Sequence, residues 1–251
     1  MQAFDLSGRV ALVTGARREI GRAIALALAG QGARVAVHHL GTAEETADAE
    51  AVVRAIGAGA CAFAADFAED GAGSRLAAKV AEAMGAVDIL VLNASIELIE
   101  DFSSVSLEHF DRQIAVNLRS TLELLQALVP PMAARGWGRV VTIGSVQQEL
   151  PHPGMFVYAG TKAMQFNWAL NLARQFGGQG VTVNNLAPGA IATARNRVQM
   201  LTEAAAIVQR IPVGRLGTPD DLVGAALLLC SDAGRYITGA NLFVDGGRHI
   251  S

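Results

Sequence analysis

Seven short runs of almost continuous apolar residues alternate with longer segments in which the apolar residues recur at helical spacing. Such runs are typical of buried strands, and such segments are typical of amphipathic helices. Strands that are apolar on both faces belong to parallel sheets that helices cover on both sides. We therefore predict an α/β fold, in which a seven-stranded parallel sheet has helices on both faces. The strands are expected at 9–14, 34–39, 60–65, 87–92, 139–143, 181–186 and 241–244, and the helices at roughly 20–31, 43–57, 71–84, 106–128, 156–176 and 218–230.

The length of 251 residues suits one large α/β domain. Because no Ser/Pro-rich linker, charge run or repeat divides the sequence, we expect a single domain over residues 1–251. The longest connection without a clear periodic pattern runs from Pro188 to about Pro219. It is a candidate substrate lid, placed at about 190–212, although residues 196–209 could be helical.

The composition argues against several classes of protein. With 20 Lys+Arg against 23 Asp+Glu, the sequence lacks the basic field that nucleic-acid binding needs. No apolar run approaches the ~20 residues that would span a bilayer, and the first residues do not resemble a secretory signal. We therefore expect a cytoplasmic protein with neither a membrane nor a nucleic acid as partner.

Cysteines and histidines give no sign of a metal site. Cys61 and Cys230 are too few for a disulfide framework or a four-ligand zinc site, and their apolar surroundings predict core positions. The histidines show no metal-ligand spacing on one helix; they are His38, His39, His109, His152 and His249. We therefore expect no bound metal.

A glycine turn follows the first expected strand, from Thr14 to Arg22. In open α/β sheets, ligands bind beyond the carboxyl ends of the strands. A turn such as Gly15 makes, leading into a helix, directs free backbone N–H groups and the helix dipole at an anion. An ordinary strand-to-helix turn could look the same, but the position after the first strand favours a dinucleotide site.

The residues after the second strand bear on the choice of dinucleotide. An acid there would bind the ribose 2′-hydroxyl of NAD, yet no acid occurs before Glu44. Arg17 and Arg18 stand in the glycine turn, where they could meet a 2′-phosphate, although both could instead be solvated. We predict a preference for NADP(H), with NAD(H) as the alternative. His38 lies either near the adenosine phosphate or simply at a polar strand end.

Tyr158 and Lys162 form the strongest chemical signal in the sequence. Residues i and i+4 share a helix face, so the phenol and the ammonium can point into one cleft, near Ser145 after the fifth strand. A free phenol has a pKa of about 10. A cation ~4 Å away is worth roughly 4 kcal/mol, or at most about three pKa units, which brings the phenol toward the range of a general acid. Ser145 can donate to the same substrate oxygen, and Lys162 can also hold the nicotinamide ribose. The alternative is a surface Tyr/Lys pair. It does not explain why a sequence with only two tyrosines and two lysines has one of each at this spacing.

These residues resemble the short-chain dehydrogenase/reductase family. The resemblance covers nearly the whole sequence, through the Thr14–Gly21 turn, Asp66, Asn93-Ala94, Asn117, Ser145, Tyr158, Lys162, Pro188-Gly189, Thr193, Tyr236–Gly239 and Val244–Gly247. It implies a Rossmann-like three-layer sandwich, a nicotinamide cofactor, and hydride transfer between that cofactor and a ketone or secondary alcohol. It also implies that Tyr158 is the acid/base, that Ser145 polarises the carbonyl, and that Lys162 lowers the tyrosine pKa. Asn117 would hold a water linking Lys162 to solvent.

The resemblance also assigns the cofactor site. Asp66 would contact adenine, Asn93 the adenosine ribose region, and Ile191 and Thr193 the nicotinamide end, while Arg18 stands at the family's usual mark of NADP preference. Further cofactor contacts are implied at Gly15, Arg17, Ile20, Gly21, His38, Phe67, Ala94, Tyr158, Lys162, Pro188 and Gly189.

Two departures from the family pattern concern this cofactor site. Glu19 replaces the second loop glycine, and Ser95 ends the segment that usually reads Asn-Asn-Ala-Gly. The Glu19 carboxylate would repel a pyrophosphate unless Arg17, Arg18 or Arg22 neutralises it, or unless it turns aside as a capping residue.

The substrate is less defined. The run after Ser145, from Val146 to Pro153, is polar, which indicates a hydroxylated substrate bound by Ser145, Gln147 and Tyr158, or only a solvated loop. The residues of these motifs are most similar to those of 3-oxoacyl-[acyl carrier protein] reductases. Three hypotheses follow: an NADPH-dependent carbonyl reductase acting on 3-oxoacyl thioesters or other ketones, a sugar or polyol dehydrogenase using NAD or NADP, and a nicotinamide-binding sensor without turnover. Retention of a complete proton relay argues against the sensor.

Partners follow from the resemblance in the same way. An acyl carrier protein would need a basic docking patch, for which Arg135, Arg139 and Arg174 are candidates. Family members usually pair the helices corresponding to 106–128 and 156–176 across a dimer interface, so a homodimer or homotetramer is expected. Phe166, Trp168 and Leu170 would then pack against a subunit, or alternatively in the core.

Overall fold

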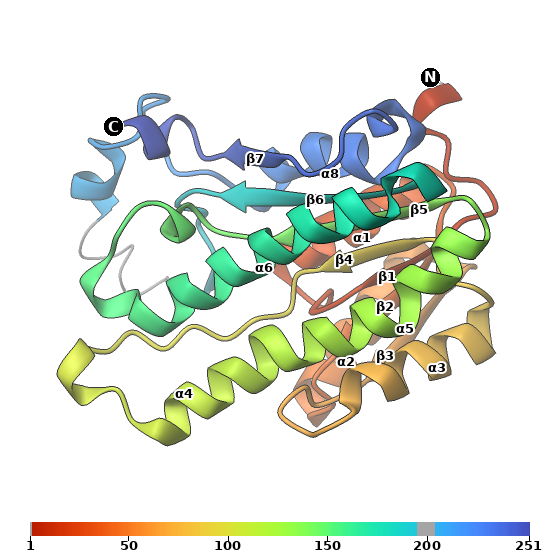
Figure 1. Cartoon of the computed structure of the whole chain (residues 1–251), viewed down its shortest axis with the longest axis horizontal. Coiled ribbons are helices and arrows are strands. Elements are labelled where there is room, and N and C mark those ends of the chain that lie inside the picture. Colours follow the sequence, from red (N-terminus) through yellow and green to blue (C-terminus); the bar gives the residue numbers. More distant parts are fainter. Residues whose placement is uncertain (1, 195–203) are drawn as a thin grey trace.

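The computed structural model describes residues 2–194 and 204–251 and contains one seven-stranded parallel sheet (Figure 1). Its strand order is β3-β2-β1-β4-β5-β6-β7. The strands are β1 (Val10–Val13), β2 (Arg34–His39), β3 (Ala60–Ala64), β4 (Ile89–Leu92), β5 (Gly138–Ile143), β6 (Val181–Pro188) and β7 (Asn241–Val244). The expected Rossmann-like α/β fold is confirmed, and all seven expected strands are present.

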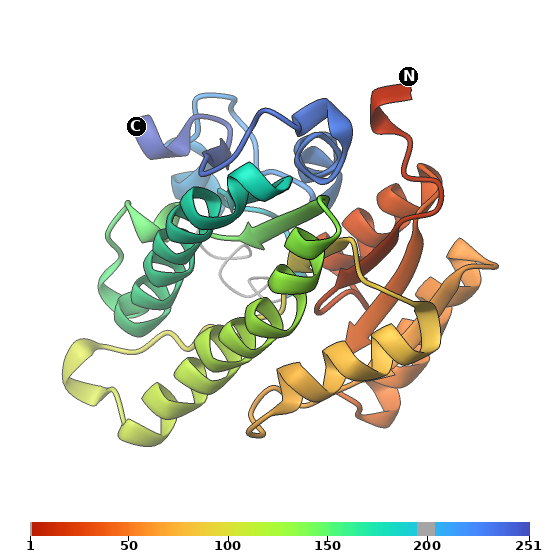
Figure 2. The same cartoon turned by 45° about the vertical axis from the view of Figure 1, so that its right-hand side comes forward.

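Helices cover both faces of the sheet, as the apolar strands require. One face carries α1 (Glu19–Gly30), α2 (Ala43–Ile56) and α8 (Val223–Cys230); the other carries α3 (Ala72–Met84), α5 (Ser120–Ala134) and α6 (Phe156–Phe176). Figure 2 shows the second layer, with α3, α5 and α6 side by side in front of the strands.

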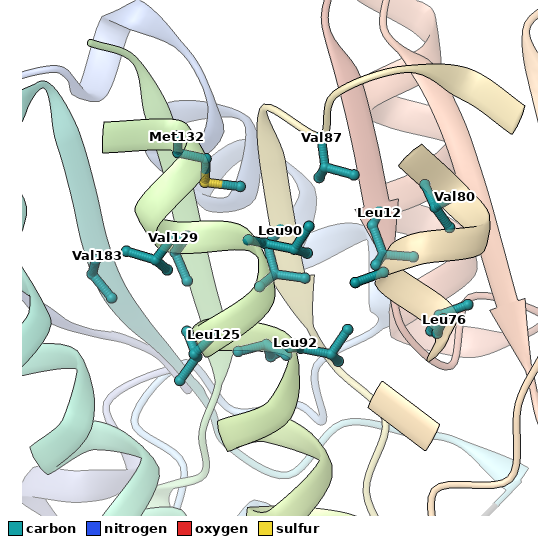
Figure 3. Close-up of a cluster of buried hydrophobic side chains, with 14 of the residues drawn as sticks. Leu12, Leu76, Val80, Val87, Leu90, Leu92, Leu125, Val129, Met132 and Val183 are labelled. Atoms are coloured by element: carbon teal, nitrogen blue, oxygen red, sulfur yellow. The ribbon is translucent and has the colours of Figure 1, made fainter. Parts of the chain in front are cut away.

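Both layers are held by apolar side chains from alternate positions of the strands. On the α3–α5 side, Leu12 and Leu90 of the sheet pack with Leu76, Val80 and Val129 of the helices, all fully or almost fully buried (Figure 3). Each such buried side chain contributes about 1.5–3 kcal/mol relative to its exposed state.

The strand order creates the site. From β1 the chain builds outward first through β2 and β3, and then on the other side through β4 to β7. The connections after β1 and β4 therefore leave the sheet in opposite directions and open a crevice beyond their carboxyl ends.

The helix expected at 106–128 is interrupted and longer than predicted. It consists of α4 (Leu107–Ile114), a π-helical turn at Ala115–Arg119, and α5, which continues through two prolines to Ala134. Each of these prolines removes only one backbone hydrogen bond, and the buried face of α5 holds the helix together beyond them. Similarly, the segment 218–230 begins with a short 3₁₀ turn at Pro219–Leu222 before α8.

One core prediction was wrong in part. Cys230 is buried, and burial raises the pKa of its thiol to about 12, but Cys61 is exposed. The reason is that β3 is the edge strand, with exposed and half-buried positions along its length. On α6, Trp168 packs against the core, whereas Leu170 is exposed.

The proposed docking arginines do not form one exposed patch. Arg139 is buried, donates to Asp232 at 2.8 Å, and lies with Arg9 against the ring of Trp137. This contradicts its assignment to a docking surface, because a buried, paired guanidinium is not available to another protein. Arg135 is exposed, but it donates to the carbonyl of Val87 at the amino-terminal edge of the strands.

The candidate lid is described only in part, because 195–203 lie outside the described residues. At its start, Ile191 forms a bridge with Gly217, and residues 204–208 are helical. The helical alternative for 196–209 is thus supported over 204–208 alone.

Candidate active site

A cavity of about 830 Å³ lies at the carboxyl ends of the strands. All predicted cofactor and substrate residues line it, together with three of the four predicted catalytic residues; Asn117 is the exception. The residues on its wall are Gly15, Arg17, Arg18, Ile20, Gly21, His38, Asp66, Phe67, Asn93, Ala94, Ser145, Gln147, Tyr158, Lys162, Pro188, Gly189, Ile191 and Thr193. Residues far apart in sequence meet here because parallel strands end at the same edge.

The floor of the crevice is a hydrogen-bonded joint between the ends of β1 and β4. The Thr14 hydroxyl accepts from the backbone N–H groups of Asn93 and Ala94, both at 2.9 Å. The Asn93 amide donates in turn to the carbonyls of Thr14 at 2.9 Å and Gly15 at 3.1 Å. Asn93 therefore holds the glycine turn in place, in addition to lining the cavity.

The glycine turn leaves the start of α1 open to the cavity. A Cβ at Gly21 would lie 2.3 Å from the Gly15 carbonyl oxygen, so only glycine fits this close approach. Arg18 precedes α1 without a side-chain cap, which leaves the first N–H groups of the helix for another acceptor. Free N–H groups at a helix start form a general anion site.

Glu19 adopts the backbone conformation of the glycine it replaces. Its φ of 52° is the only left-handed value for a non-glycine residue among those described. The carboxylate turns aside and accepts from the N–H of Ala194 at 3.0 Å, so it does not cap α1. Of the alternatives given in the sequence analysis, Glu19 therefore turns aside, and the Ala194 N–H is its hydrogen-bond donor.

His38 connects three parts of the adenosine end of the cavity. Its Nδ1 accepts from the Gly15 N–H at 3.0 Å, so Nε2 carries the proton and donates to the Ala65 carbonyl at 3.0 Å. The ring stacks on Phe67, with centroids 4.2 Å apart. Burial lowers the pKa of His38 from 6.5 to about 4, so the ring is neutral at neutral pH.

The two loop arginines have different surroundings. Arg17 pairs with two carboxylates of α2, Glu45 at 2.8 Å and Asp48 at 2.6 Å. Arg18 is exposed at the cavity and forms no ion pair with the described residues. Of the two, Arg18 is therefore the one left to meet a phosphate.

Tyr158 and Lys162 lie on one face of α6, as the four-residue spacing predicts. The Lys162 ammonium is 5.6 Å from the centre of the Tyr158 ring. Both side chains are buried in the wall of the cavity, and Lys162 donates to the Ile143 carbonyl at 2.7 Å. This bond ties the helix to the end of β5, two residues before Ser145.

Ser145 starts a short 3₁₀ turn that shapes the opposite wall. Its hydroxyl oxygen accepts from the N–H of Gln147 at 3.1 Å, and its backbone N–H donates to Gln148. The Gln147 side-chain oxygen is buried without a hydrogen-bond partner among the described residues. A buried acceptor of this kind needs a donor, which a bound molecule could supply.

Asn117 lies behind Lys162, in the π-helical turn. Its amide is held by the backbone of Ile96 and by Thr161, while its backbone carbonyl accepts from Gln165 at 2.6 Å and Thr121 at 2.8 Å. Two side-chain donors thus bond to the carbonyl, and the role of Asn117 in holding a water stays a prediction.

Sequence reasoning missed four residues of this region. Gln165 sits one helical turn after Lys162, a spacing that could have revealed it. Glu45 reaches the end of β2 from α2, while Arg210 and Arg248 line the cavity from the distal part of the chain. These three carry no local signal, because only the tertiary fold brings them to the crevice.

Other kinds of site are not found. In the described part of the chain, no three histidine, cysteine or acidic side chains gather as a metal site would require. None of the helices described there combines the length and apolar character of a membrane span.

Known proteins support the same interpretation. The family profile described as Enoyl-(Acyl carrier protein) reductase matches residues 15–249. The chain is 36% identical over 247 residues to the 3-oxoacyl-[acyl-carrier-protein] reductase FabG of Escherichia coli, covering 98% of this chain and all of that protein. The chain belongs to the short-chain dehydrogenase/reductase family.

Solved structures agree with this short-chain dehydrogenase/reductase assignment. A 3-oxoacyl (acyl-carrier-protein) reductase from Agrobacterium tumefaciens, with NADP bound, is 42% identical with a TM-score of 0.90, covering 98% of this chain and 96% of that one. A gluconate 5-dehydrogenase from Burkholderia cenocepacia, in complex with NADP and tartrate, is 33% identical with a TM-score of 0.92, covering 99% and 98%.

Proposed function

We propose that the protein is an NADP(H)-dependent oxidoreductase that transfers a hydride between nicotinamide and a ketone or secondary alcohol. The observation that carries this proposal is the shared cavity. It joins the Gly15–Gly21 turn at one end to Ser145, Tyr158 and the buried Lys162 at the other. A dinucleotide bound along it would bring its nicotinamide beside the phenol.

The residues present fit such a cofactor. Gly21 lets the chain pass close to Gly15, and the uncapped start of α1 offers N–H groups to the pyrophosphate. Arg18 would meet the 2′-phosphate of NADP(H), whereas Arg17 is already neutralised by Glu45 and Asp48. The NADP-bound relatives support this preference, with NAD(H) as the weaker alternative.

Each catalytic role then follows from position. The cofactor, when bound, gives or takes a hydride. Tyr158 donates its phenolic proton to the carbonyl oxygen during reduction and takes the proton back during oxidation. Ser145 donates a hydrogen bond to the same oxygen, and the Lys162 ammonium stabilises the negative charge that develops on the phenolate.

Two substrate classes have support of different kinds. The acyl-carrier-protein reductases among the relatives favour a 3-oxoacyl thioester. Against this, Arg135 and Arg139 are near the amino-terminal edge of the sheet, and Arg174 is about 24 Å along α6 from Tyr158. These arginines therefore lie away from Ser145, and the unpaired buried oxygen of Gln147 favours the second class, a sugar or polyol.

The remaining expectations are proposals as well. We infer a cytoplasmic, single-domain protein whose segment 190–212 borders the substrate. A homodimer or homotetramer would cover the exposed apolar side chains around α4 and the start of α6, of which Phe102, Leu107 and Phe156 are 71%, 80% and 60% exposed.

The proposal is tested with a panel of substrates, and turnover is measured from the change in cofactor absorbance. Purified protein is given NADPH or NADH with ketones and 3-oxoacyl thioesters, and NADP⁺ or NAD⁺ with sugars and sugar acids. Turnover that is abolished by Tyr158→Phe, with cofactor affinity retained, supports the proposal. Cofactor binding with no turnover on any substrate would overturn it in favour of a nicotinamide sensor.

A further inference from the structure

Two arginines line the cavity and belong to neither the cofactor residues nor the catalytic residues assigned above. Arg210 lies two residues after the helical segment 204–208, and Arg248 lies after β7. The two segments are joined by the Ser251 hydroxyl, which donates to the Arg210 carbonyl at 2.6 Å, and by the Val213 N–H, which donates to Gly246 at 3.1 Å. Both arginines line the cavity that contains Ser145 and Tyr158.

Neither guanidinium is neutralised within the described chain. No ion pair to Arg210 or Arg248 occurs between described residues. Both side chains line the same cavity, and the pKa of Arg248 is lowered first by burial and then by the charge of Arg210, while Asp245 raises it. The nearby Asp245 carboxylate already accepts from the His249 ring and from the backbone N–H groups of Gly247 and His249.

We propose that Arg210 and Arg248 bind the carboxylate of a small polyhydroxylated acid, which narrows the sugar or polyol class favoured above; this inference rests on the proposed oxidoreductase function. Arg248 is half-buried and Arg210 is exposed, and both line the same cavity. Two like charges on one cavity wall are stabilised by an anion between them, and guanidinium groups match the planar carboxylate. The unpaired oxygen of Gln147 accepts from a hydroxyl of the same molecule. Together these groups select a hydroxy acid over a neutral polyol.

The chemistry balances without another reactant. In oxidation, the carbinol carbon loses a hydride to NADP⁺ and its oxygen loses a proton to the Tyr158 phenolate. The products are a keto acid, NADPH and neutral Tyr158. Ser145 and Tyr158 hold the reacting oxygen, while the carboxylate is held apart from it by the arginine pair.

The experiment compares gluconate with glucitol, which has the same hydroxylated chain without the carboxylate. Steady-state kinetics with NADP⁺, and calorimetric binding to the NADP⁺ complex, are measured for the native protein, Arg248→Gln and Arg210→Gln. Arg54→Gln, an exposed arginine at the end of α2, is the matched control. Loss of one charged hydrogen-bond donor should weaken gluconate binding about 10- to 100-fold in either pocket variant.

The outcomes separate this inference from the proposed function. The site is supported if both pocket variants lose gluconate binding while their affinities for glucitol and NADPH change less than about twofold. Equal losses for gluconate and glucitol, weakened NADPH binding, or no gluconate binding to the native protein would overturn it. Turnover of neutral ketones or thioesters in that last case would leave the proposed oxidoreductase function standing.

A second inference rests on the hydrogen bonds behind Lys162. Gln165 is buried, accepts from the Lys162 ammonium through Oε1 at 3.2 Å, and donates through Nε2 to the Asn117 carbonyl at 2.6 Å. The side-chain amide of Gln165 therefore connects the Lys162 ammonium to the Asn117 carbonyl in the π-helical turn. We infer that Gln165 is a positioning residue, which holds the Lys162 charge beside the Tyr158 ring.

The test titrates the phenol directly. The chain has two tyrosines, so in a Tyr236→Phe background the ultraviolet absorbance of phenolate reports Tyr158 alone. Gln165→Met removes these two hydrogen bonds and a third, from Nε2 to the Thr121 hydroxyl, at similar volume; Gln175→Met on the exposed side of α6 is the control. We expect the Tyr158 titration to move upward in pH by about one unit and kcat to fall about tenfold in Gln165→Met only. An unchanged titration in a variant with unchanged Tm would overturn the assignment, whatever the substrate proves to be.

Discussion

Acidification should destabilise this protein through His38. The folded state binds a proton at this ring only below about pH 4, because burial lowers its pKa from 6.5 to about 4. In the unfolded chain the ring is protonated below about pH 6.5. Between these two values the unfolded state binds more protons, so the free energy of unfolding falls as the pH falls.

The size of the effect follows from the difference of about 2.5 pKa units. At about 1.36 kcal/mol per unit, His38 contributes roughly 3 kcal/mol at pH 7.5 relative to pH 4 and below. About 2 kcal/mol of this is lost by pH 5. His38→Asn removes the titration but keeps an oxygen that can accept from the Gly15 N–H. This variant should be less stable at pH 7.5, since the bond to Ala65 and the stacking on Phe67 are lost.

The assay is urea unfolding between pH 7.5 and pH 5, at one protein concentration so that any assembly affects all samples equally. The native protein should lose about 2 kcal/mol more than His38→Asn over this range. Other titrating groups, His39 included, occur in both proteins and cancel in the difference. Parallel pH profiles for the two proteins would refute the argument, because they would mean that His38 has the same pKa in the folded and unfolded states.

Four further substitutions test separate parts of the structure. Tyr158→Phe should lower kcat by at least about 100-fold, the typical contribution of a general acid, with the Kd of NADPH changed less than twofold in a fluorescence titration. Arg18→Ala should raise the Kd of NADPH by about tenfold and leave that of NADH unchanged, because only NADPH has the 2′-phosphate; equal effects on both would exclude that contact. Glu19→Gly should relieve about 1 kcal/mol of left-handed strain and bind NADPH at least as well, whereas a large loss in the same titration would show a positive role for the carboxylate. Leu90→Ala, in the centre of the sheet, should lower the free energy of unfolding by about 2–5 kcal/mol in urea titrations.

The sequence was sufficient to predict the sheet, because each strand is a local pattern. It was less informative about what surrounds each strand. Cys61 lies in an apolar run like those of the central strands, yet β3 is at the edge, and sequence patterns do not show strand order. The π-helical turn at Ala115–Arg119 was equally hidden, since one additional residue per turn barely alters the helical spacing.

The site was predictable to the extent that its residues follow strand ends or share a helix face. This is why Tyr158, Lys162 and the Gly15 turn were found, and why they line one cavity. Arg139 was misassigned because a charged residue in an apolar strand can be buried if it has a partner, and its partner Asp232 is distant in sequence. Arg210 and Arg248 were missed for the same reason: their proximity depends on contacts between the C-terminal segment and the chain around Val213.

The charge of the cavity differs from the charge of the chain, because cationic side chains outnumber acidic ones on its wall. The net charge is −3, which by itself would repel an anionic dinucleotide. Yet the acids on the cavity wall are fewer than the cations: they are Glu19, Glu45, Asp66 and Glu97, and of these Glu45 pairs with Arg17. Cationic groups on the same wall, Arg18 and the Arg210–Arg248 pair among them, have no ion pair with the described residues. Because a cleft with low-dielectric walls concentrates the field of its unneutralised charges, these few arginines determine the local potential. The crevice can therefore attract an anionic cofactor and an anionic substrate although the whole chain is acidic.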